Sequence, residues 1–257
     1  MNNTTKPRLV LKIGTSTLTG GTSSISRGKI EDISRQILAL QKEYDVIVVS
    51  SGAIAAARQF DKLNDPADLV MNKSSLSAIG QPKLMQMYID AFNDFGLNAA
   101  QCLLTYYDLQ GKESRTNTEA TLKDLIGHGY IPIINENDTV SVEEIELGDN
   151  DKLSALVAVL VGAQKLVIAS DIDGLYDSNP NLNDDAKLIE EIKDINEIKK
   201  YVEDIDSDLG TGGMESKIAA LEICQGNDIE VIIVNGGVSF FLQKVLNNEI
   251  PSTVFKS

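Results

Sequence analysis

The sequence has 257 residues, 42% of them hydrophobic, which is enough to build the core of one large α/β domain or two small ones. Its 23 lysines and arginines stand against 38 aspartates and glutamates, a net charge of −15. Such an acidic chain argues against a nucleic-acid coat or a protein of anionic membrane surfaces, so any phosphate site must be local.

Targeting and redox signals point to the cytoplasm. The longest apolar run, residues 155–163, is shorter than the ~20 residues that span a bilayer. Residues 1–7 lack the apolar core of a signal peptide. Cys102 and Cys224 lie far apart without the spacing of a metal site, which indicates reduced thiols. We therefore expect a cytoplasmic protein without membrane or nucleic-acid partners.

The first predicted element is a buried strand at residues 9–13, which contains Lys12 and ends at Gly14. A lysine inside an apolar strand is costly to bury unless a negative group meets it. A phosphate at the carboxyl end of the strand would do so, with Thr15 and Ser16 as further donors. In the alternative interpretation, the lysine extends to solvent and has no ligand.

A second strand leads into a possible anion site. A helix over residues 30–44 with Ser26 as its N-cap precedes a strand at 45–49. That strand ends at Ser50-Ser51-Gly52, and a helix begins at Ala53. Such a junction presents amides and hydroxyls at a helix N-terminus, where an anion or carboxylate can bind. Alternatively, Ser-Ser-Gly is only a tight turn with a cap.

Residues 68–94 have a helical pattern with a predicted break at Gly80-Gln81-Pro82. Strands at 98–105 and 130–134 and a helix at 114–127 follow. This alternation predicts a largely parallel sheet with ligands at the carboxyl ends of its strands. Three methionines are expected to pack in the core or an interface, and the single histidine to cap a helix. These residues are Met71, Met85, Met87 and His128.

Polar residues then gather at both ends of one loop. Asn135-Glu136-Asn137-Asp138 follows the strand, residues 140–147 suggest a small hairpin, and Gly148-Asp149-Asn150-Asp151 precedes an apolar helix at 152–162. Carboxylates suit an ammonium group and amides suit a carboxylate, so this loop fits a small zwitterion. In the alternative interpretation, Asp151 is only the N-cap of its helix.

The last third of the sequence contains a glycine-rich segment. A strand at 165–169 ends at Ser170-Asp171, and an acidic stretch covers 184–208. Residues 209–217 then lead into a helix at 218–225, a typical polyphosphate cradle without Walker A spacing. A flexible linker is the alternative interpretation. A strand at 230–234 follows, and we expect no second C-terminal domain.

These segments, in this order, resemble the amino acid kinase superfamily along nearly the whole chain. The matching segments are residues 11–16, 50–54, 134–138, 148–151, 170–171, 174–176, 210–214 and Lys217. The resemblance implies a three-layer α/β/α sandwich with a central, mostly parallel sheet. It further implies one domain over 1–257, roughly 1–165 binding the amino acid and roughly 166–257 the nucleotide.

Within the superfamily, the sequence is most similar to members that phosphorylate the side-chain carboxylate of L-glutamate with ATP, the first step of proline biosynthesis. The resemblance implies that Lys12 and Lys217 contact the transferring phosphate, and that Asp151 orients both lysines. The implied amino-acid ligands are Ser51, Gly52, Asp138 and Asn150. The implied nucleotide ligands are Lys12, Ser170, Asp171, Thr211, Gly212, Gly213, Met214, Glu215, Ser216 and Lys217.

The acceptor in this reaction needs no general base, because a carboxylate with a pKa of ~4.3 is already ionised at neutral pH. Positioning and charge neutralisation remain the tasks of the protein. We expect Mg²⁺ to bridge the β- and γ-phosphates, with its protein ligands undetermined, and the chain to form a homo-oligomer, a dimer or tetramer.

Two alternatives stay open. One is another activity of the superfamily, on N-acetylglutamate, aspartate, carbamate or a nucleoside monophosphate, and the other is a non-catalytic sensor. The acidic loop favours free glutamate, because a free ammonium group calls for carboxylates.

Overall fold

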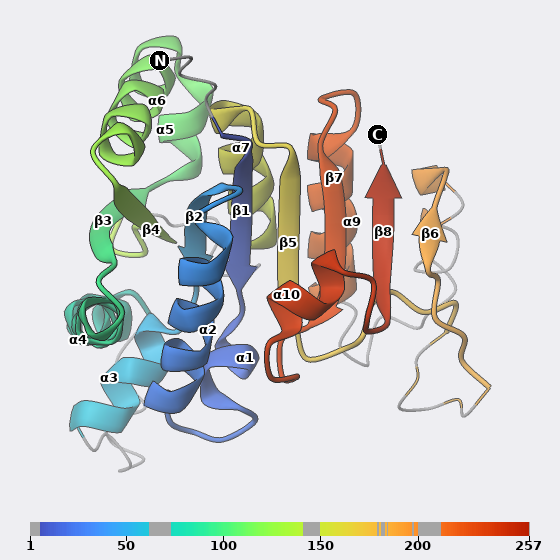
Figure 1. The fold of residues 1–257 in the computed structure, drawn as a ribbon, viewed down its shortest axis with the longest axis horizontal. Helices are drawn as coiled ribbons and strands as arrows, with labels where there is room; N and C mark the ends of the chain where they lie inside the picture. The colour runs from blue at the N-terminus through green and yellow to red at the C-terminus, as the bar shows by residue number, and fades with distance from the viewer. Residues whose placement is uncertain are drawn as a thin grey trace.

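A computed structural model of the chain describes residues 6–61, 73–140, 150–178, 180, 183, 185–196, 198–199 and 212–256. These residues form one eight-stranded sheet in the order β3-β4-β2-β1-β5-β7-β8-β6 (Figure 1). The strands are β1 Arg8–Ile13, β2 Asp45–Ser50, β3 Asn98–Leu104, β4 Tyr130–Glu136, β5 Lys165–Ser170, β6 Glu191–Ile192, β7 Glu230–Asn235 and β8 Ser252–Lys256. The helices are α1 Thr15–Thr19, α2 Arg27–Leu40, α3 Ala53–Asp61, α4 Lys73–Asp94, α5 Tyr106–Gln110, α6 Lys112–Gly127, α7 Asp151–Val161, α9 Gly212–Cys224 and α10 Phe241–Leu246.

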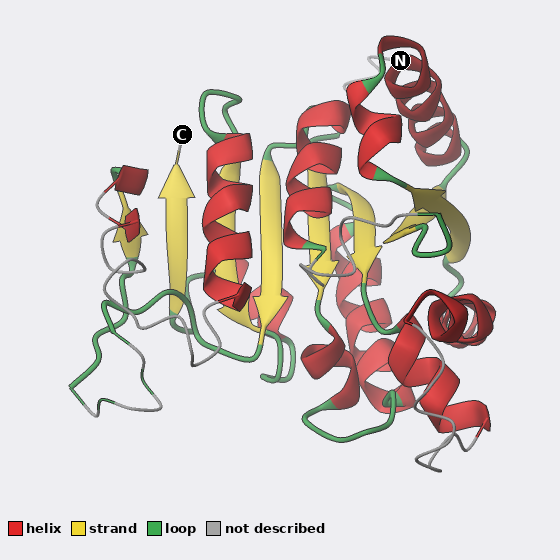
Figure 2. Cartoon of the chain, turned by 180° about the vertical axis from the view of Figure 1, so that it is seen from behind, coloured by secondary structure: helices red, strands yellow, loops and turns green. Residues whose placement is uncertain are grey.

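Helices cover both faces of this sheet. In Figure 1 α2 and α10 lie in front of the strands, and from behind α7 and α9 do (Figure 2). Successive residues of β1 therefore enter opposite layers: Val10 joins the cluster with α7 and α9, whereas Leu9 and Leu11 join the one with α2 and α4. The predicted three-layer sandwich with a mostly parallel sheet is confirmed. The division into two lobes stays a prediction.

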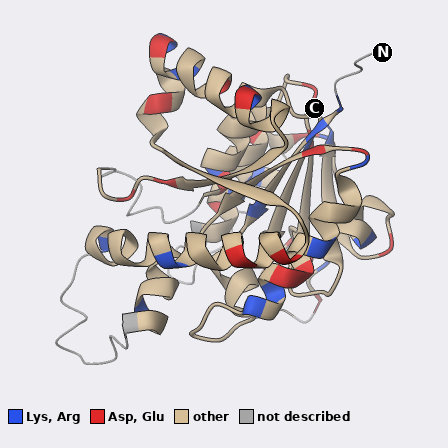
Figure 3. Cartoon of the chain, turned by 60° about the vertical axis from the view of Figure 1, so that its left-hand side comes forward, with Lys and Arg blue, Asp and Glu red and all other residues tan. Residues whose placement is uncertain are grey.

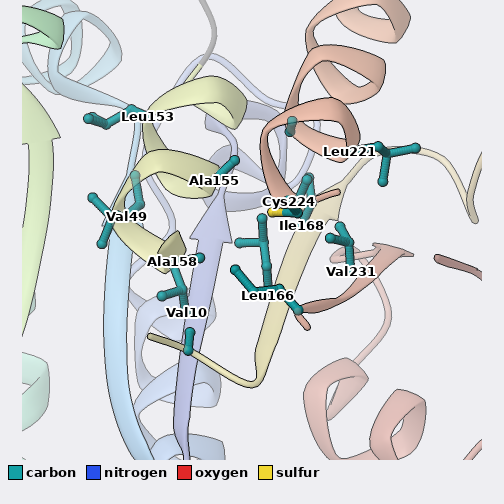
Figure 4. Close-up of a cluster of buried hydrophobic side chains, with 14 of the residues drawn as sticks. Val10, Val49, Leu153, Ala155, Ala158, Leu166, Ile168, Leu221, Cys224 and Val231 are labelled. Atoms are coloured by element: carbon teal, nitrogen blue, oxygen red, sulfur yellow. The ribbon is translucent and has the colours of Figure 1, made fainter. Parts of the chain in front are cut away.

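The first cluster is the buried apolar layer between the sheet and helices α7 and α9. Figure 4 shows Val10 and Leu166 of the sheet facing Ala158 of α7, with Leu221 and Cys224 of α9 beside them. Both Cys102 and Cys224 are free thiols, as predicted. Burial raises the pKa of the Cys224 thiol to about 12, which keeps it protonated and apolar in this layer.

Three local signals in the sequence correctly predicted a helix end, although α2 ends at Leu40 and not near the predicted Tyr44. The Ser26 hydroxyl caps α2 by accepting a hydrogen bond from the Lys29 amide, as predicted. His128 caps α6, with Nδ1 2.9 Å from the Asp124 carbonyl oxygen, also as predicted. Gly162 ends α7 in the left-handed conformation, at φ 61°.

The predicted break at Gly80-Gln81-Pro82 is wrong, because α4 runs through it from Lys73 to Asp94. A Cβ atom on Gly80 would lie 1.8 Å from the Ala53 carbonyl oxygen, so the glycine allows α4 to pack against α3. Burial of Leu84 and Tyr88 compensates for the hydrogen bond that Pro82 cannot donate. Met85 is buried and Met87 half-buried, whereas Met71 and residues 68–72 lie outside the described residues.

Four elements were missed from the sequence: α1, α5, α10 and β8. The signal for α5 was a capping box, in which Thr105 and Asp108 bond each other's backbone amides. Strand β8 pairs antiparallel with β7, and its alternating burial matches the pattern of residues 252–256. Helix α9 begins at Gly212, six residues before the predicted start at Ile218, because the glycine-rich segment already contributes its first turn.

Other predictions fall wholly or partly outside the described residues. The predicted hairpin at 140–147 is one, apart from Val140, and the acidic stretch at 184–208 is described only in part. Charged residues lie mainly on helices and at strand ends, whereas the middle of the sheet is nearly uncharged (Figure 3). No helix among the described residues combines the length and hydropathy that a membrane span requires.

Candidate active site

The candidate site lies along the edge where β1, β2, β4 and β5 all end. These strands are parallel, so their carboxyl ends meet on one side of the sheet, toward α1 and α3 in Figure 1. Gly14, Ser51 and Asn137 follow three of these strand ends in the chain. The doubly wound topology therefore gathers segments that are far apart in the sequence, as the alternation of elements predicts.

Two lysines share one buried aspartate at this edge, and we call Lys12, Asp151 and Lys217 the ion cluster. Lys12 Nζ lies 2.6 Å from Asp151 Oδ1, and Lys217 Nζ lies 3.3 Å from Asp151 Oδ2. The aspartate is fully buried and each lysine is 5% exposed. With two cations and one anion, the ion cluster carries an excess positive charge at a buried place, which suits a phosphate.

Helix α9 fixes the position of the second lysine. Lys217 Nζ also donates to the Gly213 carbonyl oxygen at 2.9 Å, and the Ser216 hydroxyl donates to Asp151 Oδ2 at 3.0 Å. Asp151 is the first residue of α7, and Asn150 is its N-cap. The interpretation of Asp151 as a mere N-cap is therefore wrong, since its carboxylate binds the lysines and Ser216.

A cavity of about 720 Å³, which we call the acceptor cavity, opens beside this edge. Ser51, Gly52, Asp138 and Asn150 all line it. Gly52 has φ +109°, and a Cβ atom there would lie 3.0 Å from Leu18 Cδ1, so only glycine fits this turn into α3. The structure thus brings the four predicted amino-acid ligands together around one space at the N-terminus of a helix.

Three buried amide side chains connect α4, β4 and the start of α7. Asn150 Nδ2 lies 2.8 Å from Asn135 Oδ1 and 3.0 Å from Ser51 Oγ. Asn135 Nδ2 in turn donates to Gln81 Oε1 of α4 at 2.8 Å. We call Gln81, Asn135 and Asn150 the amide chain. It links helix α4 to the predicted amino-acid ligands through hydrogen bonds alone.

A pair of carboxylates lies at the end of β4. Glu136 and Asp138 both line the acceptor cavity, and the Ser77 hydroxyl of α4 donates to Asp138 Oδ2. Burial and the neighbouring Glu136 charge raise the pKa of Asp138, while the bond from Ser77 opposes the rise. Two carboxylates at one cavity can bind an ammonium group.

The predicted nucleotide residues lie in two places. Ser170 ends β5 next to β1 and donates to Asp171 Oδ1 at 3.1 Å. Gly212 and Gly213 open α9, whose Ser216 and Lys217 reach Asp151. Met214 packs against the apolar layer and the Glu215 side chain is exposed, so the structure does not bring these two side chains to the ion cluster. Thr211 lies outside the described residues.

Several residues near the acceptor cavity were missed from the sequence, including Arg58, Lys73, Ser77 and Gln81. Arg58 and Lys73 line it with positive charge, while Ser77 and Gln81 bond residues that line it. Three of them lie on α4. Because the sequence predicted a break in this helix, it did not indicate which face of α4 is directed to the site. The signal available was Gly80, which permits close packing of that helix. In the described part of the chain, no group of three or more metal-ligating side chains occurs.

Comparisons with known proteins agree with this geometry. Residues 7–235 match the amino acid kinase family. Glutamate 5-kinase of Clostridium acetobutylicum is 44% identical over 250 residues, covering 96% of this chain and 94% of the relative. Glutamate 5-kinase of Proteus mirabilis is 42% identical over 249 residues, covering 96% of this chain and 68% of the relative.

Solved structures support the fold. Carbamate kinase from Giardia lamblia bound to AMP-PNP superposes with a TM-score of 0.70 at 18% identity, covering 98% of this chain and 99% of that one. UMP kinase from Ureaplasma parvum gives a TM-score of 0.68 at 21% identity, with the same coverage. The chain belongs to the amino acid kinase family, and within it to the glutamate 5-kinases.

Proposed function

We propose that this protein transfers the γ-phosphoryl group of ATP to the side-chain carboxylate of L-glutamate, forming L-glutamyl 5-phosphate and ADP, which begins proline biosynthesis. The observation that carries the proposal is the ion cluster at the same strand edge as the acceptor cavity. The identity to glutamate 5-kinases over nearly the whole chain supports it. A cytoplasmic location and a homo-oligomeric state stay predictions from the sequence.

Lys12 and Lys217 stabilise the phosphoryl group in transfer. Charge spreads over its oxygens in the transition state, and two ammonium groups held by one carboxylate neutralise that charge without having to reorganise. Asp151 separates the lysines and keeps both in place. The attacking carboxylate is already ionised, so no residue has to remove a proton.

The acceptor cavity binds and orients the amino acid. Asp138, with Glu136 beside it, takes the ammonium group. Ser51 and Gly52, at the N-terminus of α3, offer donors for a carboxylate. Asn150 lines the same cavity and donates hydrogen bonds to Ser51 and Asn135. A ligand gripped at both ends presents its side-chain carboxylate in one orientation, which is the main part of catalysis by proximity.

The nucleotide enters from the side of β5 and α9, as Mg-ATP. Ser170, Asp171 and the segment from Thr211 to Lys217 are the residues we assign to it. Magnesium prefers oxygen ligands and commonly keeps several waters. Phosphate oxygens of the nucleotide and water molecules would therefore hold the ion without protein ligands. In the described residues Asp151 is already bound to two lysines, which fits a metal that arrives with the substrate.

An acyl-phosphate trap tests this proposal. Purified protein with Mg-ATP, hydroxylamine and glutamate should form the hydroxamate of glutamate together with ADP. Aspartate and N-acetylglutamate serve as matched acceptors, one shorter by a methylene and one without a free ammonium group. Turnover with either of these but not with glutamate would assign another activity of the family. Binding of glutamate by calorimetry with no turnover of any acceptor would assign a sensor.

A further inference from the structure

We infer that Gln81 is a positioning residue for the amino-acid site, which acts through Asn135 to fix the orientation of the Asn150 amide. This inference rests on the proposed function and deepens it, because it states which substrate group Asn150 binds. Gln81 lies in the Gly-Gln-Pro segment that the sequence presents as a helix break.

Close helix packing brings Gln81 to the site. Gly80 lets α4 approach the first turn of α3, where a Cβ atom would lie 1.8 Å from the Ala53 carbonyl oxygen and 2.6 Å from the Ala57 nitrogen. The next residue, Gln81, is 7% exposed, and its amide accepts a hydrogen bond from Asn135 inside the protein. Asn135 is 4% exposed and Asn150 is 8% exposed, so water competes little for these hydrogen bonds.

One backbone amide determines the direction of the whole amide chain. The Glu136 N–H can only donate, and it lies 2.9 Å from Asn135, so the atom it meets must be Oδ1. The other end of the Asn135 amide is then Nδ2, a donor, which faces Gln81 at 2.8 Å and requires an acceptor there. Gln81 therefore presents Oε1.

The same reasoning orients Asn150. It faces Asn135 Oδ1 at 2.8 Å, so it must present Nδ2 there. This Nδ2 also lies 3.0 Å from Ser51 Oγ and 3.3 Å from the Ser50 carbonyl oxygen, both of which can accept. Its two N–H groups are thus engaged by protein acceptors, and among the described residues no donor meets Oδ1, so we assign this atom of the cavity-lining Asn150 to the ligand.

An amide oxygen binds a donor, so the substrate group at Asn150 is the ammonium group and not a carboxylate. Without an acceptor at position 81, Asn135 Nδ2 is a buried donor with no partner, and only the Glu136 N–H still opposes rotation of the Asn135 amide. Rotation of Asn135 would present a donor to Asn150 and reverse that amide as well. Gln81 thus stabilises the orientation of Asn150 at the ammonium site through Asn135, without contacting the substrate itself.

Replacement of Gln81 by methionine tests this, because methionine has a similar length and no acceptor of comparable strength. Gln81→Met should raise the KM for glutamate about tenfold, the low end of the cost of an unpaired buried donor, with the KM for ATP unchanged. Gln81→Glu keeps an oxygen for Asn135 and should restore the KM to within roughly threefold of the wild type. The matched control is Gln86→Met on the exposed face of the same helix, where the side chain bonds Asp90.

A double-mutant cycle separates positioning from packing. In an Asn150→Ala background, Gln81→Met should not raise the KM for glutamate further, because the Asn150 amide that Gln81 orients is then absent. Equal increases in both backgrounds, or a wild-type KM in Gln81→Met, would overturn the inference. The proposed function fails separately, if the wild-type protein forms no hydroxamate from glutamate at all.

Discussion

The ion cluster and the amide chain lie at the same strand edge, but one consists of charged side chains and the other of neutral amides. In the ion cluster, three formal charges come from β1, α7 and α9. The amide chain contains neutral groups from α4, β4 and the start of α7. Both are buried to a similar degree, so the difference between them is chemical and not one of exposure.

This difference corresponds to two tasks. Phosphoryl transfer gathers negative charge, and fixed positive charge lowers its barrier, so the ion cluster should govern kcat. The ammonium and α-carboxylate groups of the amino acid keep their charges throughout the reaction, and the site has to hold them in one orientation. The amide chain and the carboxylates beside it should therefore govern KM. The predictions below, from the largest effect to the smallest, test this division.

The largest effect is expected from the lysines. Lys12→Ala and Lys217→Ala should each lower kcat by about 10²–10³-fold, roughly 3–4 kcal/mol, because each removes one charge stabiliser. Steady-state ADP release by the folded variants measures this. Lys165→Ala is the control, since Lys165 is a strand lysine paired with Glu230 at 2.9 Å, at the opposite end of β5. Near-normal turnover in either site variant would refute the role of the ion cluster.

A smaller effect is expected at the cavity. Asp138→Ala should raise the KM for glutamate roughly 30-fold, or ~2 kcal/mol, through loss of a charge-assisted contact with the ammonium group. The KM for ATP should change little. Initial rates with each substrate varied at saturation of the other distinguish the two constants. A changed KM for ATP with a constant KM for glutamate would move Asp138 to the nucleotide side.

Helix packing should matter more for the amide chain than for the ion cluster. Gly80→Ala forces a methyl group against the backbone of α3 and should destabilise the fold by ~1–3 kcal/mol. It should also raise the KM for glutamate, because Gln81 moves with α4. Urea unfolding and initial rates measure the two effects. Gly127→Ala, a helical glycine with open space around it, is the control and should be neutral or stabilising.

The smallest effect is a shift in pH dependence. Burial already raises the pKa of Asp138, so protonation on acidification should weaken glutamate binding at a higher pH than for an ordinary aspartate. Ser77→Ala removes the hydrogen bond that opposes this rise, so the increase in KM for glutamate should begin at a still higher pH. KM measured across a pH series tests this, with Ser34→Ala in α2 as the control. A profile displaced to lower pH would contradict the assignment.

Several parts of the site follow from local sequence. Lys12 stood out because a lysine in an apolar strand needs an anion, and Ser51 and Gly52 because they follow a parallel strand. Gln81 and Ser77 gave no such signal, since Gly-Gln-Pro is typical of a helix break and serine of a helix surface. Their function depends on the packing of α4 against α3.

The sequence by itself determined the alternation of strands and helices, the buried parallel sheet and the edge at which polar residues collect. Periodicity and strand burial are local properties, so they can be seen without the fold. Only the tertiary structure decided that Asp151 lies between two lysines and that Gln81 reaches Asn135. Those contacts join residues 54 and 66 positions apart, and their partners are set by how helices pack on the sheet.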